Sequence, residues 1–67
     1  MTMRERLWEL TNRRPFQPFR VVLKGGETVD VVERFTCIVM PRQIFMEARE
    51  GHMKLYPVES VERVDEL

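Results

Sequence analysis

The stretch FRVVLKGGETVDVVE, residues 19–33, constrains the fold of this chain most, because it has the pattern of a β-hairpin. Two runs rich in β-branched residues flank a pair of adjacent glycines. Side chains alternate between the two faces of a strand, so Phe19, Val21 and Leu23 share one face of the first run. The sequence therefore predicts two antiparallel strands that contribute an apolar face to a core.

The length of the hairpin loop follows from where the acidic residue in the second run would lie. A two-residue loop at the glycine pair would pair Val21 with Asp30 and place an acid on the apolar face. Pairing Leu23 with Val29 and Val21 with Val31 avoids this, and it needs a longer loop of roughly three or five residues with a glycine at φ > 0. We predict the longer loop.

A short helix and an extended connector precede this hairpin. Thr2 and Glu5 have the spacing of a capping box, and Leu7 and Leu10 continue an apolar stripe along residues 2–12. A helix of this length is marginal alone, so we expect it to dock on the sheet. The prolines of residues 13–18 predict an extended connector, whose phenylalanine contacts the core.

A second hairpin is predicted from Gln43–Arg49 and His52–Pro57, around Glu50-Gly51. A two-residue loop pairs Ala48 with Met53 and Met46 with Leu55 on one face, and Glu47 with Lys54 and Phe45 with Tyr56 on the other. This register places Tyr56 and Phe45 side by side on the outer face.

The remaining segments complete a small β-rich domain. Residues 37–40 suggest a short buried strand, 58–61 a single turn, and 61–67 a last strand. We predict one domain over residues 1–67, mainly β within the α+β class. It has an N-terminal helix followed by a strongly bent sheet of five antiparallel strands, or a small open barrel, over residues 19–67.

Composition limits how such a chain can be stabilised and where it acts. Among 67 residues there is one cysteine, so no internal disulfide can form, and no cysteine–histidine cluster offers a structural metal site. Oligomerisation is then a natural source of further stability. The free thiol and the charged N-terminus predict a cytoplasmic protein, and no apolar run reaches the ~20 residues of a membrane span.

Charge is balanced over the whole chain but not along it. Eleven basic and eleven acidic residues cancel, whereas residues 1–26 carry a net charge of +4 and residues 27–67 a net charge of −4. Pairing between neighbouring strands accounts for such a split. A basic surface that meets anions, or the acidic surface of a second copy, is the other interpretation.

The residue pattern of an enzyme is absent from the sequence. His52 is the single histidine and follows a turn, and Cys37 lies in an apolar run where a thiol behaves as a small hydrophobe. The glycine pair lacks the lysine and the helix of a phosphate-binding loop. We predict no catalytic residues, no cofactor and no metal.

Two kinds of partner fit the sequence. Open strand edges, at Val61–Leu67 or Gln43–Arg49, could pair with another copy, with Phe45 and Tyr56 at the centre of the interface. Single-stranded RNA is the alternative, with basic residues along an edge and aromatic rings for stacking. The candidate contact residues for either partner are Arg13, Arg14, Arg20, Lys24, Arg42, Phe45, Lys54 and Tyr56.

Two resemblances follow from longer strings of residues. The string P-F-x-x-x-L-x-G-G-x-T-V-D-V, the apolar strand after it and the closing V-x-S-V-E-R-V resemble a family of small uncharacterised bacterial proteins, numerous in planctomycetes. The resemblance covers about residues 15–65. That family often has a histidine-proline step where this chain has Val32-Glu33-Arg34. It implies a common layout and brings no function with it.

The layout also resembles the Sm-like fold, which includes the bacterial RNA chaperone Hfq. The segment LKGG, residues 23–26, is similar to one in archaeal members, and Tyr56 matches the tyrosine of a Tyr-Lys-His segment. Pro57 and Val58 replace the lysine and histidine, and an Asp-x-x-x-Asn pattern is absent after Phe35. The resemblance implies an SH3-like or Sm-like small barrel and ring-forming homo-oligomers. We expect a non-enzymatic, self-associating protein-interaction module.

Overall fold

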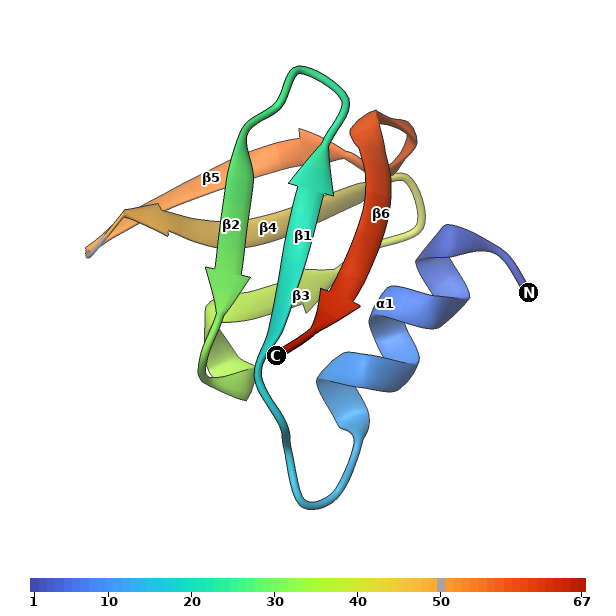
Figure 1. The fold of residues 1–67 in the computed structure, drawn as a ribbon, viewed down its shortest axis with the longest axis vertical. Helices are drawn as coiled ribbons and strands as arrows, with labels where there is room; N and C mark the ends of the chain where they lie inside the picture. The colour runs from blue at the N-terminus through green and yellow to red at the C-terminus, as the bar shows by residue number, and fades with distance from the viewer. Residues whose placement is uncertain (50) are drawn as a thin grey trace.

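The computed structural model describes residues 1–49 and 51–67. Within these residues the chain forms one α-helix, six strands and two short 3-10 turns (Figure 1). The elements in chain order are α1 (Met3–Asn12), β1 (Phe19–Leu23), β2 (Thr28–Val31), η1 (Arg34–Thr36), β3 (Cys37–Val39), β4 (Gln43–Arg49), β5 (His52–Pro57), η2 (Val58–Ser60) and β6 (Val61–Glu66).

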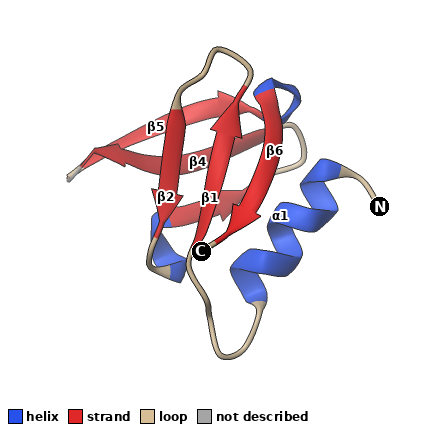
Figure 2. Cartoon of the chain, in the orientation of Figure 1, coloured by secondary structure: helices blue, strands red, loops and turns tan. Residues whose placement is uncertain are grey.

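The six strands make two antiparallel sheets of three strands each, in the orders β2-β1-β6 and β3-β4-β5. The β2-β1-β6 sheet lies in front of the β3-β4-β5 sheet, and their strands cross at a steep angle (Figures 1 and 2). The predicted α+β, mainly β character is confirmed. The strands number six and form two sheets, in place of the predicted single sheet of five strands. The sheet divides at η1, where the N–H of Thr36 donates to the carbonyl of Glu33 at 3.1 Å and the chain turns from β2 into β3.

The loop of the first hairpin is longer than two residues, as predicted. The N–H of Leu23 donates to the carbonyl of Glu27 at 2.8 Å, which leaves a loop of residues 24–26. Gly26 has φ +93°, and its N–H donates to the carbonyl of Leu23 at 2.9 Å. A side chain would be strained in this left-handed conformation, so glycine suits the position.

The register of this hairpin differs from the prediction by two residues. Val21 pairs with Val29 and Phe19 with Val31, in place of Leu23 with Val29 and Val21 with Val31. A shift of two residues keeps every side chain on its face, so the alternation of apolar residues fits both registers equally well. The apolar face itself is confirmed, because all five of these side chains are buried.

The second hairpin has the predicted strand boundaries but a different register along most of its length. Arg49 pairs with His52, and beyond that pair Glu47 faces Met53, so Ala48 is an extra residue in β4. One extra residue of this kind is a β-bulge. Of the predicted two-residue loop, Glu50 lies outside the described residues, and Gly51 has φ +76°.

The bulge corrects the predicted pairs of the second hairpin. Tyr56 lies opposite Ile44 and Phe45 opposite Leu55, so Tyr56 and Phe45 are on opposite faces of the sheet. The predicted pairs Phe45–Tyr56, Met46–Leu55, Glu47–Lys54 and Ala48–Met53 are therefore wrong. The tyrosine is turned into the core, where 6% of its surface is exposed.

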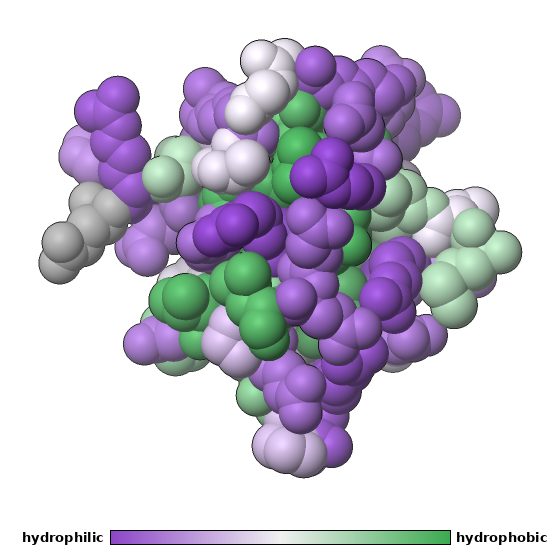
Figure 3. All heavy atoms as spheres, in the orientation of Figure 1, coloured by the Kyte–Doolittle hydropathy of each residue, from purple (hydrophilic) through white to green (hydrophobic). Residues whose placement is uncertain are grey.

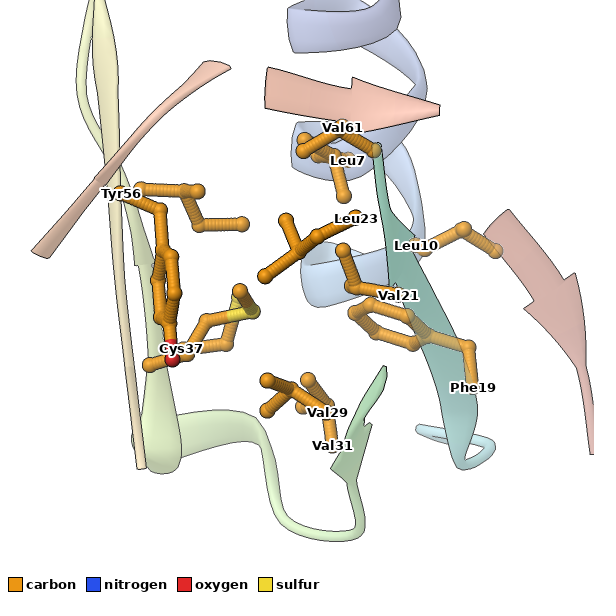
Figure 4. Close-up of a cluster of buried hydrophobic side chains, with 12 residues drawn as sticks. Leu7, Leu10, Phe19, Val21, Leu23, Val29, Val31, Cys37, Tyr56 and Val61 are labelled. Atoms are coloured by element: carbon orange, nitrogen blue, oxygen red, sulfur yellow. The ribbon is translucent and has the colours of Figure 1, made fainter. Parts of the chain in front are cut away.

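The core lies between the two sheets and is closed by α1. Side chains from β1, β2, β3, β5, β6 and α1 converge on one another in Figure 4. Leu7 and Leu10 from α1 are buried, and the predicted capping box is present, with Thr2 and Glu5 bonded in both directions. The connector is held by Phe16, whose ring centroid lies 6.1 Å from that of Phe19.

The front face of the molecule is mostly hydrophilic (Figure 3). Green, hydrophobic side chains gather there near the lower end of β2 and the C-terminus. The exposed hydrophobic residues Val32 and Leu67 follow β2 and end the chain, respectively. Most large exposed hydrophobic residues lie elsewhere, on α1, η1 and the β3-β4-β5 sheet.

Replacing Phe19 by alanine should come close to unfolding the protein. Its side chain is fully buried, and truncating such a residue costs about 3–5 kcal/mol, against a total of about 3–10 kcal/mol for a chain of this size. Urea denaturation followed by circular dichroism measures the loss. Phe35→Ala is the matched control: this ring is 77% exposed, so its loss should change the free energy of unfolding by less than about 0.5 kcal/mol. Equal effects would contradict the core described above.

Candidate interaction surface

Two of the predicted basic contact residues are held by acids of the same molecule. The guanidinium of Arg20 donates two hydrogen bonds, of 2.7 and 3.2 Å, to the carboxylate of Asp30 on the neighbouring strand. Arg13 donates to Glu66 at 2.6 Å, and Arg6 donates to the other oxygen of that carboxylate at 3.1 Å. These pairs join basic residues of the first part of the chain to acids of the second, so they absorb part of the charge split.

Two more of the predicted contact residues, Lys24 and Arg42, lie at one end of the molecule. The N–H of Lys24 donates to the carbonyl of Ser60 at 2.9 Å, and the carbonyl of Arg42 accepts from the N–H of Val58 at 2.9 Å. Both contacts involve η2, so the loop between β1 and β2 and the turn between β3 and β4 meet there. Arg14 is exposed in the connector, apart from this pair.

Lys54 and Tyr56 lie together on the inner face of β5. The Lys54 ammonium lies 5.3 Å from the centroid of the Tyr56 ring, and the Tyr56 hydroxyl donates to Glu27 at 2.9 Å. Burial, then the hydrogen bond to Glu27 and its negative charge, raise the pKa of Tyr56 to about 12. A ring buried in this way has no open face on which a base could stack.

Phe45 is half-buried on the outer face of the β3-β4-β5 sheet, in a row of apolar side chains. Ile38 lies opposite it on β3 and Leu55 on β5, and Met53 faces the same side one step along. Cross-strand neighbours of this kind are about 4.5–5.5 Å apart, so the row is continuous. We call Ile38, Phe45, Leu55 and Met53 the outer apolar face.

Sequence reasoning missed three members of this face because it placed Leu55 and Met53 on the core side and left Ile38 in a buried strand. The cause is the bulge at Ala48, which turns over the remainder of β4 relative to β5. A bulge needs no glycine, so nothing in the composition of β4 marks it.

A groove lies between α1 and the edge of β3, next to the outer apolar face. Its lining includes Trp8 and Thr11 from α1, Arg34 and Phe35 from η1, and Ile38 and Val39 from β3. Trp8 is 56% exposed and Phe35 77% exposed, although both are large apolar rings. Exposed apolar side chains that gather in this way are typical of surfaces that bind a partner.

The thiol of Cys37 does not have the properties of a nucleophile. It is buried beneath this groove, with its sulfur 3.8 Å from the hydroxyl of Thr11. Burial raises the pKa of Cys37 to about 11, so the thiolate is scarce at neutral pH. Among residues 1–49 and 51–67, no cluster of three histidine, cysteine or acidic side chains could hold a metal ion.

The single tyrosine gives a direct test of its burial. Its phenolate absorbance should titrate at a pH of about 12 in the folded protein, whereas the ordinary pKa is about 10. Because the folded state holds the proton more tightly, the free energy of unfolding should fall as the pH rises between these values. Glu27→Gln removes the neighbouring charge and should lower the midpoint while leaving it above 10. A native midpoint near 10 would place the ring in solvent.

The ion pair between Arg20 and Asp30 makes a second prediction. The hydrogen bond from Arg20 lowers the pKa of Asp30 below its ordinary value, so this pair stabilises the fold above that value and the contribution is lost as the pH falls through the lowered pKa. Arg20→Met should return the pKa of Asp30 to the ordinary range, as measured by NMR titration of its carboxyl carbon. Arg14→Met should leave that pKa unchanged, and an equal change in both variants would contradict the pairing.

Comparison with known proteins adds no relative to this description. No family model matches the chain, and no significant match is found among curated proteins or among solved structures. In the described part of the chain, no helix is long and apolar enough to cross a membrane. The function therefore has to be argued from the surfaces described above.

Proposed function

We propose that this protein is a non-enzymatic protein-interaction module that associates with copies of itself through its strand edges. The observation that carries the proposal is the strand order, β2-β1-β6 and β3-β4-β5, in which β5 and β6 each pair on one side only. The N–H and C=O groups along an unpaired edge are a template for another strand. β4 lies between β3 and β5, so the edge expected at Gln43–Arg49 is replaced by the edge of β5.

The finer architecture that we propose is a small SH3-like or Sm-like barrel. Three features support it: a leading helix, two crossed sheets joined by the bend at η1, and a 3-10 turn before the last strand. In such a barrel β5 and β6 border the open seam. β2 and β3 are edge strands too, but they are joined through η1, so we propose that neighbouring copies use the edges of β5 and β6.

Charge supports a contact between β5 of one copy and β6 of the next. β5 carries Lys54 and His52 and no acid, whereas β6 carries Glu62, Asp65 and Glu66 beside a single arginine. Opposite charges on two different edges favour a head-to-tail contact, which closes into a ring when the rotation permits. Glu66 is already shared with Arg6 and Arg13. Glu62 and Asp65 lie beside Arg63, at 3.4 and 3.3 Å, so a neighbouring copy would compete with this arginine for them.

Native mass spectrometry and light scattering at rising protein concentration test this proposal. We expect oligomers that dissociate as salt is added, and a Lys54→Glu variant whose association is weaker by about tenfold or more, because it places an acid opposite acids. Arg4→Glu is the control, since it makes the same charge change at an exposed residue of α1 that lies on neither strand edge. A protein that stays monomeric at high micromolar concentration and low salt would contradict self-association.

The same experiment separates the alternative, binding of single-stranded RNA. An oligomer that retains nucleotide, and whose RNA affinity falls with salt and with substitution of Arg13 or Arg14, would favour that function. Of the eight contact residues predicted from the sequence, Arg13 and Arg20 are paired with acids and Tyr56 is buried. The RNA proposal is therefore the weaker of the two.

A further inference from the structure

The edge of β3 offers main-chain groups to the groove between α1 and β3. The N–H of Met40 donates to the carbonyl of Gln43 at 2.8 Å, so these two residues form a hydrogen-bonded pair of the antiparallel ladder. Pairs two residues apart are of the same kind, so Ile38 and Phe45 also form such a pair, and the N–H and C=O of Val39 point away from β4. Val39 lines the groove, and β3 pairs with no strand on that side.

The groove is open, and large apolar side chains line it beside the polar residues Thr11, Asn12 and Arg34. Trp8 on α1 and Phe35 on η1 line it together with Ile38, and all three side chains are at least half exposed. Ile38 also belongs to the outer apolar face, so the groove continues onto that face without a break. A segment that lies along β3 would bury alternate side chains against these rings.

Positive charge at the groove favours a segment that carries acidic residues. Arg34 lines the groove, and among the described residues it forms no ion pair. Arg4 lines a second hollow, which Trp8 also lines, and it too is unpaired among the described residues. The acids of that hollow are engaged: Glu5 caps the helix, and Glu9 faces Arg6 at 3.6 Å. An acidic occupant would be attracted to both arginines.

The size of the surface argues for a short segment over a folded partner. Three strands about 4.8 Å apart, over the three residues of β3 at about 3.3 Å each, present a face of about 150 Å². A stable interface between folded proteins covers about 800 Å² per partner. A second copy packed face to face would therefore gain little. An extended peptide gains main-chain hydrogen bonds as well as apolar contacts from a surface of this size.

From these observations we propose that the groove between α1 and β3 binds a short extended segment of another protein by strand addition to β3. The segment pairs with the main chain of Val39, places apolar side chains against Trp8, Phe35 and Ile38, and carries acidic residues toward Arg34. This contact uses the edge of β3, whereas the proposed self-association uses the edges of β5 and β6. The two proposals can therefore be tested independently.

Trp8 is the only tryptophan of the chain, so its fluorescence reports on the groove directly. The probe is the acetylated and amidated peptide Val-Thr-Val-Thr-Val-Glu-Glu, titrated into the full chain. We expect a saturable blue shift of the Trp8 emission and slower hydrogen exchange at the amide of Val39 in NMR. Two matched peptides serve as controls, one with the glutamates replaced by lysines and one N-methylated along its backbone. Both should bind more weakly by about tenfold or more.

Variants of the protein distinguish binding in the groove from non-specific hydrophobic binding. Arg34→Glu should weaken binding of the acidic peptide by about tenfold and reverse the preference between the acidic and basic peptides. Leu67→Ser is the control, since Leu67 is 57% exposed, about as much as Trp8, but does not line the groove. The free energy of unfolding of each variant shows that it remains folded.

Three results would overturn the proposal. Equal binding of the N-methylated peptide would exclude strand addition, and no fluorescence change up to millimolar acidic peptide would exclude the groove as a peptide site. A blue shift that follows protein concentration in the absence of peptide would place a second copy in the groove. Because Lys54→Glu leaves the groove intact, peptide binding by that variant shows whether the two proposed contacts are independent.

Discussion

One extra residue in β4 decides which side chains of β5 face the core. Between Glu47 and Arg49 the ladder with β5 shifts by one, and Ala48 is left without a partner. Every pair on the far side of the bulge is then turned over relative to the pair beside the loop. Tyr56 enters the core as a result, and Leu55 and Met53 face outward, so both the interior and the outer apolar face depend on this position.

The core accepts Tyr56 because its hydroxyl has a partner at the edge of the other sheet. Burying a hydroxyl without a hydrogen bond is costly, and the bond to Glu27 at 2.9 Å removes that cost while tying β5 to the loop that precedes β2. The other side of the core is closed by Leu7 and Leu10 from α1. In the described chain, no buried side-chain nitrogen or oxygen lacks a partner, which is consistent with a small core that holds one arrangement.

Local chemistry made much of this fold readable from the sequence. The capping box of α1 and the glycine at φ +93° depend on nearest neighbours along the chain, and they appear where the residues predict. The two registers depend on distant partners, and these were the errors. A two-residue shift in the first hairpin preserves the faces, so the pattern could not detect it, and Ala48 carries no feature that marks a bulge. Tyr56 was predicted on the outer face because the wrong register was used for β5. Phe45 is on the outer face as predicted, although its partner on β5 is Leu55 and not Tyr56.

Three of the large exposed apolar residues, Trp8, Phe35 and Ile38, line the groove beside the shortest strand of the sheet. β3 has three residues, and η1 before it turns Phe35 outward, so α1 and β3 leave a groove between them that the chain itself does not fill. A longer β3 would give α1 more edge to cover, and a smaller residue than Trp8 would remove one wall of the groove. The edges of β5 and β6 lie elsewhere and differ from the groove in their charged residues, which are Lys54 on β5 and three acids on β6. The self-association that we propose through β5 and β6 would therefore leave the groove beside β3 open to the proposed peptide.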